Sequence, residues 1–149
     1  MTAESAMQKL EPFAGEWEME ATFPGMAPMG GARTTFEWME GKRLLVQRWT
    51  IPMPEAPDGL AVYSFDTSRK TLLQHYFDTR GVIRLYEMSF ENGLWILVRN
   101  QADFTPLDFS QRFTGRFSAD GNTIAGTWEL ANDHVTYEKD FDITYRKLR

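Results

Sequence analysis

The sequence predicts an all-β protein, an up-and-down antiparallel β-barrel of about ten strands with a short N-terminal helix. Apolar and polar residues alternate along almost the whole chain, and helical periodicity is confined to the first dozen residues. Turn signals separate about ten alternating segments at the spacing typical of a sandwich or barrel. No helical stretch is long enough to connect parallel strands, so the strands are expected to follow one another as an antiparallel meander.

The two ends of the chain define the helix and the closing strands. Residues 3 to 13 form the expected helix, whose apolar side carries Met7, Leu10 and Phe13. The first strand, "EWEMEATF" (16–23), alternates glutamates with Trp17, Met19, Ala21 and Phe23, and "KDFDITYR" (139–146) alternates in the same way. Both strands carry acidic rows, so if they pair, arginines or an offset register must dilute the repulsion.

One hairpin fixes a register. The pair Asp120-Gly121 is a strong signal for a two-residue turn. Centring the turn there places Phe113 opposite Trp128 on one face and Arg112 opposite Glu129 on the other. A single register therefore sorts apolar from polar side chains and creates a cross-strand ion pair, as a half-buried sheet requires.

The connections differ in length between the two ends of the predicted barrel. The segments 24–31, 52–59, 101–107 and 131–136 are long, whereas the turns at 41–42, 92–93 and 120–121 are tight. In a meander, alternate connections lie at the same end, so the long loops should surround a mouth and the helix should fill the base. The loop methionines Met26, Met29 and Met53 are either an adaptable lid over an apolar ligand or side chains packed on the rim.

Composition narrows the class of protein. The 149 residues suggest one domain, spanning residues 1–149, with a core large enough to fold unaided. A net charge of −5 without a basic block argues against a nucleic-acid partner. The chain has no cysteine, and it has neither a signal peptide nor an apolar run of membrane length, so we expect a cytoplasmic protein with no membrane partner.

Several short motifs resemble a known family. They are "GEW" (15–17), "EGKRLL" (40–45), "QHYFDTRGV" (74–82), "DFSQRF" (108–113), "TIAGTWE" (123–129) and "DFDITY" (140–145). They are similar to an uncharacterised bacterial domain-of-unknown-function family with a lipocalin-like (calycin) β-barrel. This resemblance implies a closed barrel and brings no established activity. The related nitrobindin-like haem proteins carry a Gly-x-Trp-x-Gly-x-Gly element, of which "GEWEMEA" keeps only the first Gly-x-Trp.

The stretch 72–100 supplies the candidate site residues. A turn of even length at "DTRG" (78–81) would place His75 and Phe77 on the same face as Arg84 and Tyr86, whereas a three-residue loop at 79–81 would reverse that relation. The Asn92-Gly93 turn adds two further residues to this face, Trp95 and Arg99. The resulting face is aromatic, carries cations and has no carboxylate. The alternation alone does not decide whether this face points inward.

If that face points inward, its cations need hydrogen bonds or a bound anion. Arg84 and Tyr86 would together hold a carboxylate at one end of a lined cavity. In the alternative interpretation the arginines extend to the rim and His75 bonds a neighbour.

These observations lead to three functional hypotheses. The first is non-catalytic binding of a small, partly apolar ligand, with or without an anionic group, inside the barrel. Its polar contacts would be His75, Arg84, Tyr86 and Arg99, and its apolar contacts Phe77, Trp95 and the loop methionines. The second is an enzyme or a haem protein of the same barrel class that uses His75. The third is a filled structural or interaction barrel without a ligand. We expect no metal and no cofactor, apart from the haem of the second hypothesis, and we expect the partner to be a small hydrophobic or carboxylate-bearing molecule.

Overall fold

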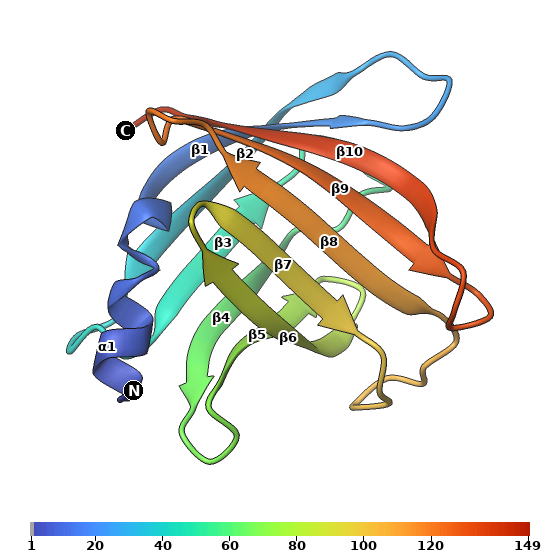
Figure 1. Ribbon diagram of the computed structural model, residues 1–149. Coiled ribbons are helices and arrows are strands. Elements are labelled where there is room, and N and C mark those ends of the chain that lie inside the picture. Colours follow the sequence, from blue (N-terminus) through green and yellow to red (C-terminus); the bar gives the residue numbers. More distant parts are fainter. Residues whose placement is uncertain (1) are drawn as a thin grey trace.

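The computed structural model describes residues 2–149 and shows a closed antiparallel barrel in which every strand pairs with its neighbours in sequence (Figure 1). The first and last strands pair with each other and complete the ring. The predicted fold class is therefore confirmed. The ten strands in the described part of the chain are β1 (Gly15–Thr22), β2 (Met29–Trp38), β3 (Leu45–Thr50), β4 (Gly59–Asp66), β5 (Thr71–Asp78), β6 (Ile83–Glu91), β7 (Leu94–Arg99), β8 (Ser110–Phe117), β9 (Thr123–Ala131) and β10 (Glu138–Lys147).

The N-terminal segment consists of helix α1 (Ala3–Gln8) and a short 3₁₀ turn (Glu11–Phe13). A capping box formed by Thr2 and Ser5 satisfies free amides at the start of α1. Met7, Leu10 and Phe13 are buried, as their spacing predicted. Lys9 of this segment forms an ion pair with Glu91, beside the tight turn between β6 and β7. The helix therefore covers the end of the barrel that carries the short turns, and the long loops lie at the other end (Figure 1).

The closing strands avoid the repulsion between their acidic rows through their register. Arg146 of β10 lies opposite Glu18 of β1, and Thr144 lies opposite Glu20. The guanidinium of Arg146 also approaches the Glu20 carboxylate at 3.7 Å. An arginine in the last strand thus faces two glutamates of the first.

Two predicted hairpin registers are confirmed. Phe113 pairs with Trp128, and the Arg112 guanidinium donates to Glu129 at 2.9 Å. Around Asn92-Gly93, Phe90 pairs with Trp95. Asn92 has φ 52° and Gly93 has φ 77°, the left-handed conformations that this type of two-residue turn requires.

The β5–β6 register corrects the predicted face of two candidate residues. Phe77 pairs with Ile83, and the amide N–H of Asp78 donates to Val82, so the loop at 79–81 has three residues. Tyr86 consequently pairs with Gln74 rather than lying on the face of His75. The even-length turn was wrong, and His75 and Phe77 point out of the barrel. One residue in a loop moves a whole strand's side chains to the opposite face.

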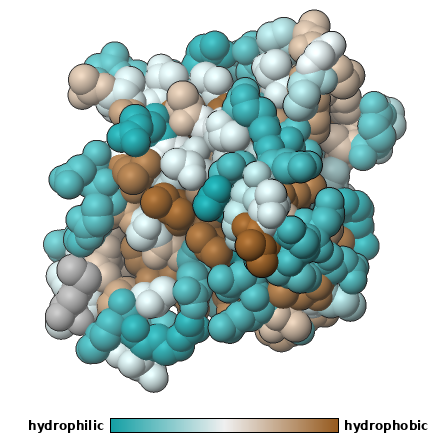
Figure 2. Space-filling view, turned by 45° about the vertical axis from the view of Figure 1, so that its right-hand side comes forward, coloured by the Kyte–Doolittle hydropathy of each residue, from teal (hydrophilic) through white to brown (hydrophobic). Residues whose placement is uncertain are grey.

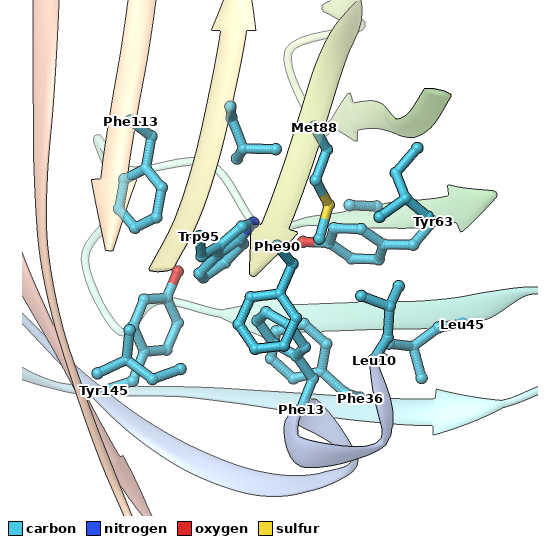
Figure 3. Packing of buried hydrophobic residues seen from close by; sticks show 14 of the residues in the cluster. Leu10, Phe13, Phe36, Leu45, Tyr63, Met88, Phe90, Trp95, Phe113 and Tyr145 are labelled. Carbon is cyan, nitrogen blue, oxygen red and sulfur yellow. The ribbon is translucent and has the colours of Figure 1, made fainter. Parts of the chain in front are cut away.

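The base of the barrel is filled by an aromatic plug centred on Phe13. Its ring lies 4.8 Å from Trp95, 4.9 Å from Phe90, 5.0 Å from Phe117 and 5.4 Å from Phe36, measured between ring centroids. Figure 3 shows Phe13 pointing from the N-terminal segment into the ring of strands. Edge-to-face contacts of this kind add to the free energy gained by burying the rings. The N-terminal segment therefore supplies the central side chain of the barrel's core.

Two glycines make room for another aromatic ring. A Cβ atom at Gly126 would lie 2.5 Å from the ring of Phe113, and one at Gly115 would lie 2.8 Å from it. Both distances are too short for a real contact. The paired glycines therefore leave the space that the Phe113 ring occupies across the sheet.

Substitution of the plug residue tests this arrangement. We expect Phe13→Ala to lower the free energy of unfolding by about 3–5 kcal/mol, because it removes a fully buried ring and leaves a void among other rings. Guanidinium chloride unfolding measures the change. The control is Phe104→Ala, whose ring is 75% exposed and whose loss should cost less than about 0.5 kcal/mol. Equal destabilisation by the two substitutions would contradict the role of the plug.

Candidate functional site

A cavity of about 790 Å³ lies inside the barrel, between the aromatic plug and the long loops. This volume falls in the range of small-molecule sites, about 300–1,000 Å³. The cavity extends to the mouth, because Met26, which is 58% exposed, is part of its lining. The lining is predominantly aromatic and aliphatic, and its rings are Phe23, Trp49, Tyr76, Tyr86, Trp95, Phe109, Phe113, Trp128, Phe141 and Tyr145.

All three loop methionines lie in the cavity wall. Met26 lies within the β1–β2 loop, Met29 is the first residue of β2, and Met53 belongs to the β3–β4 loop; both loops are at the mouth. Thioether side chains repack readily around ligands of different shape. Their position is compatible with an adaptable lid, one of the two roles that the sequence left open, and this role stays a prediction.

Arg84 and Tyr86 point into the cavity and meet on a third side chain. The Tyr86 hydroxyl donates to Gln111 Oε1 at 2.7 Å, and Arg84 Nη1 donates to the same oxygen at 3.2 Å. Burial raises the pKa of Tyr86, so its phenol remains a hydrogen-bond donor. The guanidinium also lies over the Phe109 ring, 5.6 Å from its centroid. One wall of the cavity therefore holds a guanidinium that is fixed in position by neutral polar side chains.

Arg84 differs from the other arginine of the lining in its charge balance. Arg80 forms an ion pair with Asp78 at 2.6 Å. Burial opposes ionisation of Asp78, but hydrogen bonds from Arg80 and Tyr76 outweigh it and lower the pKa of this carboxyl. Within residues 2–149, no carboxylate lies within ion-pair distance of Arg84, whose buried Nε has no hydrogen-bond partner. Asp140 also belongs to the lining, and burial raises its pKa.

Arg99 does not belong to the cavity lining. It is 2% exposed, and it donates to Asp103 from Nε at 2.9 Å and from Nη2 at 2.8 Å. It also donates to the carbonyl of Thr105. The sequence suggested a face without a carboxylate, and this was wrong for Arg99, because the loop after β7 folds back and supplies one. Arg99 therefore anchors the loop.

His75 and Phe77 lie on the outer surface of β5. The His75 ring is half-buried, and its Nε2 lies 3.0 Å from Ser64 Oγ. Burial lowers the pKa of His75. Phe77 is 36% exposed. Neither side chain reaches the interior. The enzyme and haem hypotheses that used His75 inside the barrel consequently lack their central residue there.

The outer face of the neighbouring strands is also partly apolar. Ile83 and Leu85 of β6 and Ile96 and Val98 of β7 are partly exposed. Figure 2 shows hydrophobic residues reaching the surface in small patches that hydrophilic residues interrupt. Scattered patches of this kind are normal on soluble proteins.

Below Arg84, the wall continues into a neutral polar cluster, which we call the floor cluster and define as Gln47, Tyr63, Gln74, Trp95 and Tyr145. The Tyr63 hydroxyl donates to Gln47 Oε1 at 2.6 Å and accepts from Gln74 Nε2 at 2.8 Å. The Tyr145 ring lies 6.0 Å from that of Trp95. All five residues are at least nine-tenths buried.

Sequence reasoning missed the glutamines of the site and Asp103. For Gln111 a signal existed, because period-two alternation puts it on the same face as Phe113, which the hairpin register had placed beside Trp128. Gln74 follows likewise from Tyr86 once the loop length is known. Asp103 had no signal, because it lies in an irregular loop.

Across residues 2–149, no group of three or more histidine, cysteine, aspartate or glutamate side chains is arranged to hold a metal ion. Over the same residues, no helix is long and apolar enough to span a membrane.

The comparison with solved structures finds chains of similar fold. One of them is Rv2717c from M. tuberculosis, with a TM-score of 0.61 and 15% sequence identity. The match covers 97% of this chain and 98% of the other. The two chains share a fold. No family model matches this chain, and neither does any curated protein, so the resemblance to the lipocalin-like family stays a prediction.

The Arg99–Asp103 pair predicts a pH-dependent stability. Burial raises the pKa of Asp103, but hydrogen bonds from Arg99 and from two backbone amides outweigh it and lower the pKa to about 2. The ionised form therefore stabilises the fold above the unfolded pKa, and this contribution disappears as the pH falls towards 2. Asp103→Asn should lower the free energy of unfolding by about 3–5 kcal/mol at pH 7, because Arg99 keeps a buried charge.

Urea unfolding of the wild-type protein and of Asp103→Asn at several pH values measures the difference between their free energies of unfolding. The gap should narrow as the pH falls from about 5 towards 2. Glu138→Gln at the exposed start of β10 is the control and should show little effect. A difference in free energy of unfolding that stays constant over this pH range would contradict the lowered pKa of Asp103.

Proposed function

We propose that the protein binds a small, largely apolar molecule with an anionic group inside the barrel, without catalysing its conversion. The observation that carries the proposal is the charge of Arg84, which lies in the wall of a cavity of about 790 Å³. Within residues 2–149, Arg84 has no carboxylate partner. A partly buried charge is costly unless a counter-charge or hydrogen bonds compensate it. A ligand carboxylate or a similar anion would provide that compensation.

The surrounding groups suit an anion at this position. Within residues 2–149, Arg84 donates through one of its nitrogens, to Gln111, which leaves the other N–H groups available. Gln111 Oε1 accepts from both the guanidinium and the Tyr86 hydroxyl, and this shared acceptor holds the guanidinium in place. A planar fork fixed in this way recognises a carboxylate better than a flexible ammonium group would.

The rest of the cavity suits an apolar body. Rings from most of the strands line it, and the methionines at the mouth present polarisable side chains that adapt to a ligand. The volume also supports binding over the filled-barrel alternative, because a structural barrel of this size would contain packed side chains. The observed barrel agrees with the lipocalin-like family that the sequence resembles.

The absence of catalysis is inferred from the arrangement of reactive side chains. His75 contacts Ser64 on the outer face of the barrel and does not reach the cavity. Tyr76 and Tyr86 of the lining have pKa values raised by burial, so neither phenol is poised as a base near neutral pH. The lining residues are accordingly better suited to holding a molecule than to transforming it.

The test uses dodecanoate, a carboxylate with a long apolar chain. We expect wild-type protein to bind it and Arg84→Met to bind about tenfold or more weakly, because a charge-assisted hydrogen bond is lost. Trp49, Trp95 and Trp128 line the cavity, so tryptophan fluorescence reports occupancy, and calorimetry confirms the affinity. Arg116→Met, on the exposed face of β8, is the matched control and should bind as wild type does. Equal affinity of the two variants would overturn the role of Arg84.

A further inference from the structure

The cavity has two chemically different polar ends. Arg84 is the second residue of β6, next to the mouth, whereas Phe90 near the other end of β6 packs against Phe13 of the plug. The six residue steps between them correspond to about 20 Å along the strand. Trp95 pairs with Phe90 and therefore belongs to the deep end. Figure 3 shows Trp95 beside Tyr145, above the plug.

Trp95 at the deep end and Gln74, which pairs with Tyr86 midway along β6, carry polar atoms without partners. Trp95 Nε1 is a buried donor and Gln74 Oε1 a buried acceptor, and neither has a hydrogen-bond partner within residues 2–149. Their side chains are 1% and 5% exposed and belong to the cavity lining. Buried polar groups in folded proteins are normally paired, and an unpaired one destabilises the structure. A hydrocarbon end of a ligand would leave both atoms unpaired.

The deep end is also neutral. The floor cluster consists of two amides, two phenols and an indole. Burial raises the pKa of Tyr63 and of Tyr145, so both phenols remain uncharged. A second ionised group placed here would lose its hydration without meeting an opposite charge. A neutral group that both donates and accepts matches this chemistry.

From these two ends we propose that the ligand is bifunctional: an anionic group at Arg84, an apolar middle, and a neutral hydrogen-bonding group such as a hydroxyl at the floor cluster. The inference rests on the proposed function and adds the chemistry of the buried end. It separates the preferred ligand class, hydroxylated apolar acids, from plain fatty acids. The hydroxyl would pair with Gln74 Oε1, Trp95 Nε1 or Tyr145 after a small side-chain rotation.

The experiment compares three pairs of carboxylates that differ only in a distal hydroxyl. They are octanoate, dodecanoate and biphenylcarboxylate, each with the derivative hydroxylated at the end far from the carboxylate. In an apolar pocket the hydroxyl would weaken binding, because its desolvation is not compensated. We expect the opposite in at least one pair, a gain of about three- to tenfold measured by calorimetry. Equal or weaker binding of the hydroxylated member in all three pairs overturns the inference.

Variants test whether the floor cluster causes the higher affinity for the hydroxylated acid. Gln74→Leu should abolish the preference for the hydroxylated member of the pair, while Gln101→Leu, in an exposed loop, should leave that preference unchanged. Tyr145→Phe removes one floor hydroxyl with little change of shape, and it should reduce the preference for the hydroxylated member. It serves as the test should Gln74→Leu fail to fold. A preference that survives both floor variants overturns the inference. If no acid in the panel binds wild-type protein, the proposed function fails as well, whereas binding without a hydroxyl preference rejects only the floor assignment.

Discussion

The packing of Phe13 into the base of the barrel is the contact on which the rest of the structure depends. A closed sheet of ten strands encloses more space than its own side chains fill, and an unfilled interior would forfeit the dispersion contacts that stabilise a core. The N-terminal segment solves this at one end by placing one ring among those of four strands. Everything above the plug is then free to form a cavity, because the core below it already holds the strands together.

The interior divides its polar groups by charge. Arg99 is matched by Asp103 from the same chain, and Arg80 by Asp78, so these cations serve the fold. Among residues 2–149, the partners of Arg84 are neutral. The same residue type therefore has two electrostatic environments in neighbouring strands, and the difference is set by a loop carboxylate. Deeper inside, amides and phenols replace charged groups, as expected where water is excluded.

Much of the architecture followed from local patterns in the sequence. Alternation and turn residues gave the strands, and Asp120-Gly121 and Asn92-Gly93 gave two registers, because two-residue turns leave little freedom. The orientation of His75 and Phe77 did not follow. It depended on whether the loop at 79–81 had an odd number of residues, which "DTRG" does not determine. The Arg99–Asp103 pair was also beyond prediction, since the fold of an irregular loop depends on tertiary contacts.

The plug has a kinetic consequence. Because the base of the barrel is sealed by Phe13 and its neighbours, a molecule in the cavity has to enter and leave by the same opening. A second molecule cannot push the first out from behind, so replacement requires the occupant to depart first. The rate of exchange would then be set by the opening of the mouth, and it would not rise with the concentration of the incoming molecule.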